Sequence, residues 1–165
     1  MAGDVSFDVV SDFDRQELVN ALDQARREIA TRYDFKGARA ELELGKDEIT
    51  LRADSETRAR SMRDLLESKA IRRGLSLKIF DWGEIEDAGG NTIRQRIGLR
   101  RGLPEDLARK ISKLIRDEFP KSKSQIQGDA VRVSGKSKDE LQRVIVRLRE
   151  EGEGYPVALQ FTNYR

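Results

Sequence analysis

Apolar and polar residues follow one another with a changing period along this chain, and each period predicts an element of secondary structure. Alternation with a period of two indicates a strand, whereas apolar residues three and four apart indicate a helix with one buried face. In the first half, the pattern predicts a strand, a helix, a hairpin, a second helix and a strand. These elements are expected at residues 6–10, 14–32, 40–53, 55–71 and 75–80.

The second half repeats this order. Its strand, helix, hairpin, helix and strand are expected at residues 93–99, 104–115, 124–133, 137–148 and 157–161. Between the halves, residues 81–92 are acidic and contain glycine without any apolar period, which is typical of a linker. Strand, helix, hairpin, helix and strand form the βαββαβ unit of ferredoxin-like domains, so the sequence predicts two such units in tandem.

The predicted fold class is therefore α+β, with two antiparallel four-stranded sheets that each carry two helices on one face. We place the first ferredoxin-like domain at residues 1–90 and the second at residues 91–165. The terminal strands of tandem units can be exchanged between the sheets, and one domain is then discontinuous in the sequence.

The triplet Gly135-Lys136-Ser137 has the ending of the phosphate-binding P-loop, G-x-x-x-x-G-K-[ST]. That pattern requires a glycine five residues earlier, and Ala130 stands there. The chain from Ala130 onward also has a strand pattern, which leaves no room for a loop whose amides surround a phosphate. Ser137 and Glu140 instead form the S-x-x-E pattern of a helix start, so we interpret the triplet as a capping turn. Lys136 then lies near a helix N-terminus, where it is able to attract a phosphate as a point charge.

The composition restricts the possible chemistry. The chain of 165 residues has no histidine and no cysteine. This excludes the usual general base at neutral pH, the Ser-His and Cys-His nucleophile pairs, thiolate zinc sites and disulfides. We therefore predict a protein that is not an enzyme, with no metal site and no cofactor.

Charge is abundant and unevenly distributed along the sequence. There are 32 basic and 30 acidic residues, so the net charge of +2 conceals a large surface charge. Residues 1–90 hold 15 basic and 20 acidic residues, and residues 91–165 hold 17 and 10, so the second half is expected to attract anions. The start of the sequence has no signal-peptide pattern and no apolar run approaches the length of a membrane span, so we expect a cytoplasmic protein without a membrane partner.

The open face of the second sheet is the main candidate for a binding surface, because the two helices cover only the other face. Strand alternation places basic and amide side chains there. They are Arg94, Arg96, Lys123, Gln125, Gln127, Arg132 and Gln160. Arg and Lys suit phosphate contacts, and Gln suits contacts to bases or sugars, so these residues with Lys136 form the predicted nucleotide or nucleic-acid site. An open face that is merely solvated shows the same alternation, and neither half has the aromatic strand that stacks RNA bases.

A second candidate lies in the segment RYDFKG, residues 32–37, where two aromatic and two cationic residues occur together. Anchoring in the core explains the aromatic residues. Arg32 and Lys36 are secondary candidates for phosphate contacts. Trp82, the only tryptophan, falls in the predicted linker and is expected to pack between the domains.

Several stretches taken together resemble one protein family. They are SFDVVSDFD, RYDFKG, TIRQRIGLRRGL, QIQGDAVRVSGKSKDELQ and YPVALQFTNYR. In this order, and over essentially the whole chain, they are similar to the YajQ family of bacterial proteins. The resemblance implies tandem ferredoxin-like, RNP-like domains, a cytoplasmic location and the binding of a nucleotide or nucleic acid. Because some members are described as cyclic di-GMP-binding effectors, it also implies a role in gene expression with a protein partner in transcription.

Two functions stay open from the sequence. One is non-enzymatic binding of RNA, a nucleoside triphosphate or cyclic di-GMP, all of which present phosphates to the same basic groups. The other is a protein-interaction adaptor whose exposed sheet edges or faces bind a partner without any nucleotide. The sequence sets neither the ligand nor the oligomeric state.

Overall fold

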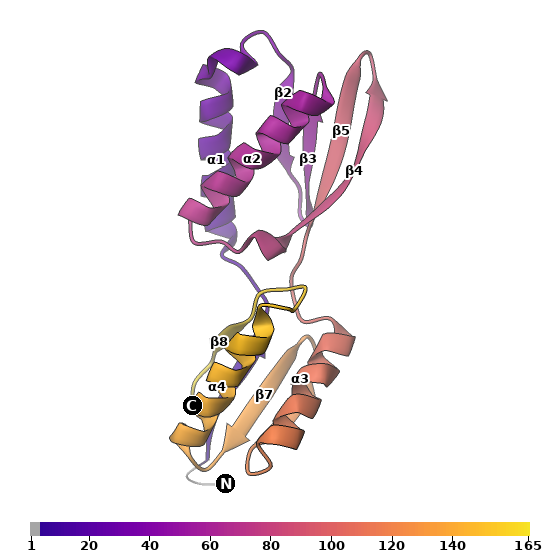
Figure 1. The fold of residues 1–165 in the computed structure, drawn as a ribbon. Coiled ribbons are helices and arrows are strands. Elements are labelled where there is room, and N and C mark those ends of the chain that lie inside the picture. Colours follow the sequence, from indigo (N-terminus) through magenta and orange to yellow (C-terminus); the bar gives the residue numbers. More distant parts are fainter. Residues whose placement is uncertain (1–3) are drawn as a thin grey trace. The chain divides into compact units, whose positions relative to one another are not determined.

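The computed structural model describes residues 4–165 and contains two compact units, each built from one four-stranded sheet and two helices (Figure 1). One unit is continuous in sequence, from Phe13 to Arg100, and we call it the continuous unit. The other joins the N-terminal residues up to Asp12 to residues 101–165, and we call it the split unit. All strand pairs in both sheets are antiparallel, so the predicted α+β class with two such sheets is confirmed.

The continuous unit has the sheet order β2-β3-β5-β4, and both of its helices cover the same face of the sheet (Figure 1). Its elements are α1 (Arg15–Thr31), β2 (Ala40–Leu44), β3 (Glu48–Ala53), α2 (Glu56–Arg72), β4 (Phe80–Gly89) and β5 (Thr92–Leu99), with short 3₁₀ turns η1 (Tyr33–Phe35) and η2 (Leu77–Ile79). The core lies between helices and sheet, where Leu22, Leu51 and Met62 are fully buried.

The split unit has the sheet order β6-β7-β1-β8. Its elements are β1 (Val5–Val10), α3 (Glu105–Glu118), β6 (Lys123–Gln127), β7 (Ala130–Gly135), α4 (Lys138–Gly152) and β8 (Gln160–Thr162). Phe7 on β1, Val133 on β7 and Ile145 on α4 meet in the core. This order is that of a ferredoxin-like sheet, in which the first strand lies between the third and the fourth.

Two strands do not belong to the sheets to which the sequence pattern assigned them. The strand that was predicted to open the second domain is β5, and it pairs with β3 and β4 of the continuous unit, with Gln95 opposite Leu51. The strand at the N-terminus, β1, pairs with β7 of the split unit, with Phe7 opposite Val133. Each four-stranded sheet needs two central strands, which are β3 and β5 in one sheet and β7 and β1 in the other. The short turn after Gly89 holds β5 against β4, and β1 then fills the equivalent place in the other sheet.

The predicted linker at residues 81–92 is wrong, because most of it forms β4. The pairing of β4 with β5 shifts register between Trp82 and Ile85, and this bulge interrupts the alternation by which a strand is detected. At the bulge a Cβ on Gly83 would lie 2.7 Å from the carbonyl oxygen of Arg96. Trp82 lies on β4 and packs against the core of the continuous unit, with its ring centre 5.9 Å from that of Phe80.

The strand exchange also removes the expected contrast in charge. The continuous unit holds 18 basic and 17 acidic residues, and the split unit holds 14 and 13, so each has a net charge of +1. The three arginines of residues 91–100 belong to the continuous unit instead of the second domain, and the three aspartates of the N-terminal segment belong to the split unit. An anion site therefore has to be argued from local geometry.

Three smaller features complete the fold. The strand predicted at 75–80 begins only at Phe80, after the η2 turn. Ser137 accepts a hydrogen bond from the backbone N–H of Glu140 at 3.2 Å, so the capping interpretation of the GKS triplet is confirmed. In the part of the chain that the structure describes, no helix combines the length and the apolar character that a membrane span requires.

Candidate functional site

The residues of the predicted open-face site are divided between the two sheets. Arg94 and Arg96 lie on β5 of the continuous unit. The register of β6 with β7 places the others together on the open face of the split unit. They are Lys123 opposite Ser134, Gln125 opposite Arg132, and Gln127 opposite Ala130, with Gln160 on β8 opposite Val10 of β1. These residues therefore do not lie together on one sheet face.

Ion pairs neutralise part of each open face. In the split unit, Arg132 Nε donates to Asp8 Oδ1 at 2.9 Å, and Asn163 Nδ2 donates to Asp8 Oδ2 at 2.9 Å. The hydrogen bond from Arg132 is the main reason that the pKa of Asp8 lies below its ordinary value, and the same contact raises the pKa of Arg132. In the continuous unit, Arg94 lies 3.4 Å from Glu86. Both faces therefore carry mixed charge.

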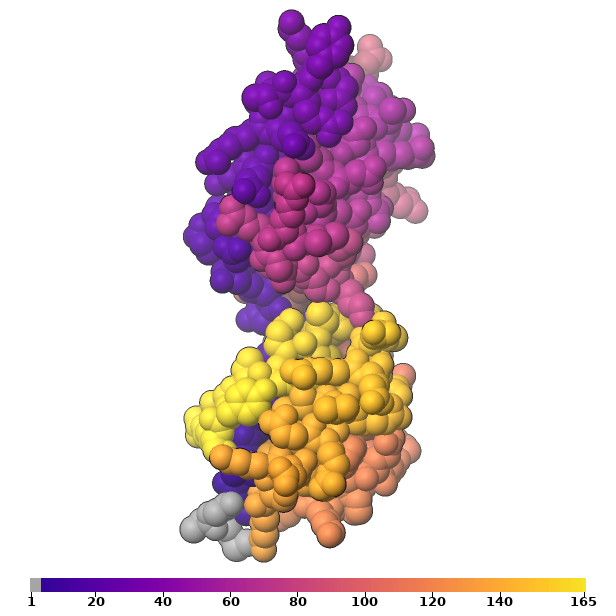
Figure 2. Space-filling model, turned by 60° about the vertical axis from the view of Figure 1, so that its left-hand side comes forward, coloured from indigo at the N-terminus to yellow at the C-terminus, as the bar shows by residue number. Residues whose placement is uncertain are grey.

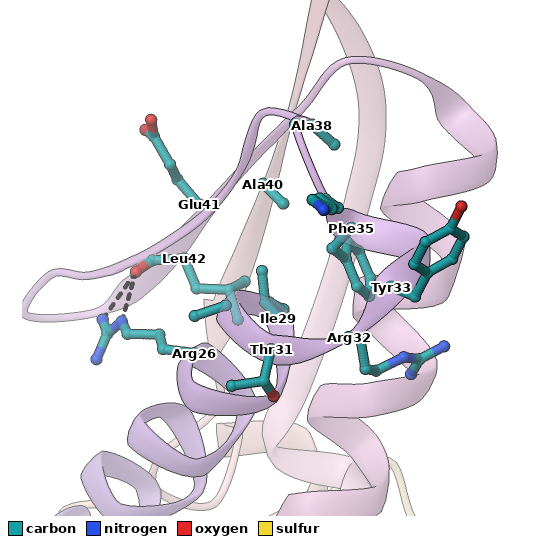
Figure 3. Close-up of a pocket in the computed structure, with 13 residues that line it drawn as sticks. Arg26, Ile29, Thr31, Arg32, Tyr33, Phe35, Ala38, Ala40, Glu41 and Leu42 are labelled. Atoms are coloured by element: carbon teal, nitrogen blue, oxygen red, sulfur yellow. Dashed lines mark hydrogen bonds between the residues drawn. The ribbon is translucent and has the colours of Figure 1, made fainter.

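A hollow of about 800 Å³ lies elsewhere, at the end of the continuous unit where α1 leads through η1 into β2 (Figure 3). All of its lining residues fall between positions 26 and 42. Ile29, Phe35 and Leu42 supply an apolar floor, and the surrounding rim is polar. The hollow is thus formed by one continuous stretch of chain, and it includes the two secondary candidates, Arg32 and Lys36.

The local sequence explains why the chain bends around this hollow. Helix α1 ends at Thr31, and the N–H of Arg32 still bonds to the carbonyl of Glu28 at 2.8 Å. Gly37 has a φ of +72°, a left-handed conformation that glycine adopts without strain, and it turns the chain into β2. The RYDFKG segment is therefore a compact connection.

Arg32 holds the segment together. Its guanidinium donates twice to the carboxylate of Asp34, at 2.9 and 2.6 Å, and lies 5.2 Å from the centre of the Phe35 ring. Arg58 lies 5.6 Å from that same ring and donates to the backbone carbonyl of Asp34. The hydrogen bond from Arg32 lowers the pKa of Asp34. Because its charge is already paired, Arg32 positions the segment more than it attracts a ligand.

Tyr33 and Lys36 present the groups that are free to bind. The side chain of Tyr33 is 89% exposed, whereas Phe35, two residues later, is 4% exposed and sits in the core. Lys36 is exposed, and no hydrogen bond or ion pair of its ammonium group occurs within residues 4–165. The sequence pattern identified Lys36 but treated both aromatic residues as core anchors, so it missed Tyr33.

Arg26 forms the opposite wall of the hollow. Its Nε and one terminal nitrogen donate to the backbone carbonyl of Leu42 at 3.0 and 2.8 Å, the bonds dashed in Figure 3. The arrangement combines an exposed ring, a free ammonium group and an apolar floor. No group of three or more metal-ligating side chains occurs among the described residues. The hollow suits a flat, partly apolar molecule that carries an anionic group.

Fold and hollow together define an α+β protein of two ferredoxin-like units with a candidate pocket for a small anionic molecule. The sequence matches the family described as nucleotide-binding protein YajQ-like over residues 5–165, and the chain belongs to this family, as its quoted stretches indicated. Among its relatives, a "Nucleotide-binding protein" from Chloroflexus aggregans is 60% identical, and one of the same name from Trichormus variabilis is 58% identical. Both matches cover the whole of each chain.

Proposed function

We propose that this chain binds a nucleotide in the hollow formed by residues 26–42 and performs no chemistry on it. The observation that carries this proposal is the combination of the exposed Tyr33 ring with the unpaired Lys36 beside an apolar floor. The names of the two relatives support the choice of a nucleotide as the ligand. The absence of histidine and cysteine supports binding without turnover.

The proposed binding mode follows from the chemistry of these groups. Stacking of a base on an aromatic side chain contributes roughly 1–3 kcal/mol, so Tyr33 supplies much of the affinity. The ammonium group of Lys36 contacts a phosphate as a point charge. Arg32 keeps the loop in shape through Asp34 and Phe35.

RNA, nucleoside triphosphates and cyclic di-GMP all carry the base and the phosphate that this mode requires. We further propose that the protein acts in the cytoplasm and that binding regulates gene expression through a protein partner. These roles are what the resemblance to described members of the family implies, whereas the description of the matching family names nucleotide binding alone.

The rival function is an adaptor that pairs a partner's strand with an exposed sheet edge. The strand β2 lies at the edge of its sheet and borders the hollow. Arg26, however, already occupies the outward carbonyl of Leu42 with two hydrogen bonds, and an incoming strand would have to displace them. This contact favours a ligand in the hollow over a strand at the edge.

Substitutions at Tyr33 and Lys36 test the proposal. We expect Tyr33→Leu to weaken the binding of GTP, cyclic di-GMP or a short RNA about tenfold, and Tyr33→Phe to preserve it, because stacking needs the ring and not the hydroxyl. Lys36→Ala should weaken binding and flatten its dependence on salt. Affinities from calorimetry at two salt concentrations give both quantities.

Lys46→Ala is the matched control, because Lys46 is also exposed and lies in the turn between β2 and β3. The proposal is wrong if the wild-type chain binds none of the three ligands, or if Tyr33→Leu and Lys36→Ala bind as the control does. A partner protein that binds equally well to all four variants would support the adaptor instead.

A further inference from the structure

Two Lys-Ser-Lys sequences meet at one end of the split unit. The first, Lys121-Ser122-Lys123, leads into β6, and the second, Lys136-Ser137-Lys138, connects β7 to α4. The register of the two strands sets Lys123 opposite Ser134, near the end of β7. The hydroxyl of Ser122 lies 3.6 Å from the position that a Cβ on Gly135 would occupy, so the two loops are in contact. We call Lys121, Lys123, Lys136 and Lys138 the lysine cluster.

The charges of the lysine cluster are not neutralised. All four side chains are exposed, and no hydrogen bond or ion pair of their ammonium groups occurs within the described part of the chain. Asp139 lies in the first turn of α4, and Asp4 precedes Val5, which pairs with Gly135. Glu140 is already paired with Arg143 at 3.1 Å. Among residues 4–165 neither Asp4 nor Asp139 forms an ion pair, so this end of the unit has four cations against two carboxylates and its excess charge is positive.

Two local features favour anions further. Two members of the cluster, Lys136 and Lys138, flank Ser137, the N-cap of α4, a helix of 15 residues whose dipole attracts negative charge at that end. Ser122 is only 6% exposed, and its buried Oγ has no hydrogen-bond partner among the described residues. This hydroxyl is an unsatisfied donor beneath the cluster, and an anion would reach it only after the loop of residues 121–123 moves to expose it.

A hollow of about 360 Å³ adjoins the cluster through Lys138. Its floor is apolar and includes Phe7 and Ile145, and its rim includes Tyr164 and Arg165. Tyr164 is 60% exposed, and its ring centre lies 6.2 Å from that of Phe7. Figure 2 shows the C-terminal segment, in yellow, at the surface of this unit beside the gold helix α4.

We propose that this end of the split unit binds single-stranded nucleic acid, with successive phosphates on the lysine cluster and a base against Tyr164. A ligand made of phosphates alone would use the lysines but leave the ring unoccupied. A duplex keeps its bases stacked inside. A single strand offers phosphates and an unstacked base at once, which matches both features. This site lies in the other unit and does not depend on the pocket of residues 26–42.

The test uses the full-length chain and a short fluorescein-labelled oligouridylate, with affinities from anisotropy over a range of salt concentrations. Alanine at all four lysines should lower the slope of log affinity against log salt by roughly 0.7 for each phosphate contact that is lost. Tyr164→Leu should weaken binding about tenfold, and Tyr164→Phe should not. Substitution of exposed residues should leave the melting temperature nearly unchanged, which a thermal melt verifies.

The matched control replaces four exposed cations of other elements, Lys46, Arg60, Lys113 and Arg116, with alanine and so removes the same charge. Equal losses in this control and in the cluster variant would mean diffuse attraction, and the proposal would be wrong. It would also be wrong if the wild-type chain did not bind the strand, or if Tyr164→Leu had no effect while inorganic polyphosphate competed equally well. Failure here is distinct from failure of the pocket, because GTP binding to the cluster variant reports on the pocket alone.

Discussion

At the scale of single residues, Asp8 determines the charge of the open face in the split unit. The sequence pattern placed this aspartate in the first domain, far from Arg132, so the face looked free of acidic groups. In the structure the side chain of Asp8 is 16% exposed and is held by Arg132 and Asn163. An arginine that is already paired in this way is a poor candidate for a phosphate contact, and Arg132 also does not line the hollow of residues 26–42.

The ion pair between Asp8 and Arg132 predicts how the stability of the fold depends on pH. Because the pKa of Asp8 is lower in the folded chain than in the unfolded chain, its contribution to stability is present above the unfolded value and is lost as pH falls through the folded value. Asp8→Asn should therefore lower the free energy of unfolding by about 1–2 kcal/mol near neutral pH and by less near pH 2, well below the unfolded pKa of 3.8. Urea unfolding at both pH values measures this. Asp64→Asn, at an exposed position on α2, should change little at either pH; an equal loss for Asp8→Asn at both pH values would contradict the assigned cause.

The sequence pattern identified some of the residues that line the pocket. It selected Arg32 and Lys36 because cations cluster with aromatics there, and both line the hollow. It did not separate the exposed Tyr33 from the buried Phe35. The η1 turn has only three residues, which is too short to show a period that distinguishes inward from outward side chains.

At the scale of elements, the long helices were predictable and the hairpin β4–β5 was not. Helices α1 and α2 each have 17 residues, so several apolar repeats and a capping side chain, Asp14 or Ser55, define them. Strand β4 carries mostly exposed residues, and its bulge breaks the alternation. Because the alternation is broken, the acidic residues and glycines of residues 81–92 matched the pattern of a linker.

Gly83 allows β4 and β5 to approach each other at the bulge. Gly83→Ala should destabilise the chain by about 1–3 kcal/mol, because the new Cβ would lie 2.7 Å from the backbone oxygen of Arg96 and the strands must move apart. Gly152→Ala is the control, since its Cβ would meet only the side chain of Leu159 at 3.7 Å. Chemical denaturation compares the two variants. Similar stabilities for both would show that the bulge does not require glycine.

At the scale of the whole molecule, the pattern predicted two ferredoxin-like units but could not assign strands to sheets. Both β1 and β5 are central strands with the same alternation, and Phe7 and Ile97 are each at most 1% exposed. Nothing in the local sequence states which sheet a central strand enters, because hydrogen bonding to either partner satisfies its backbone equally. The assignment matters for function, since it places Arg94 and Arg96 in a different sheet from Lys123 and gives each unit a net charge of +1.

The position of the bound nucleotide is the most direct test of the proposed function. Titration of the ¹⁵N-labelled full-length chain with GTP, followed by amide chemical shifts, reports where the ligand lies. The expected result is a set of saturable shifts concentrated in residues 29–42, abolished by Tyr33→Leu and retained in Lys46→Ala. Shifts confined to the strands β6 and β7, or no saturable shifts at all, would contradict a nucleotide site in this pocket.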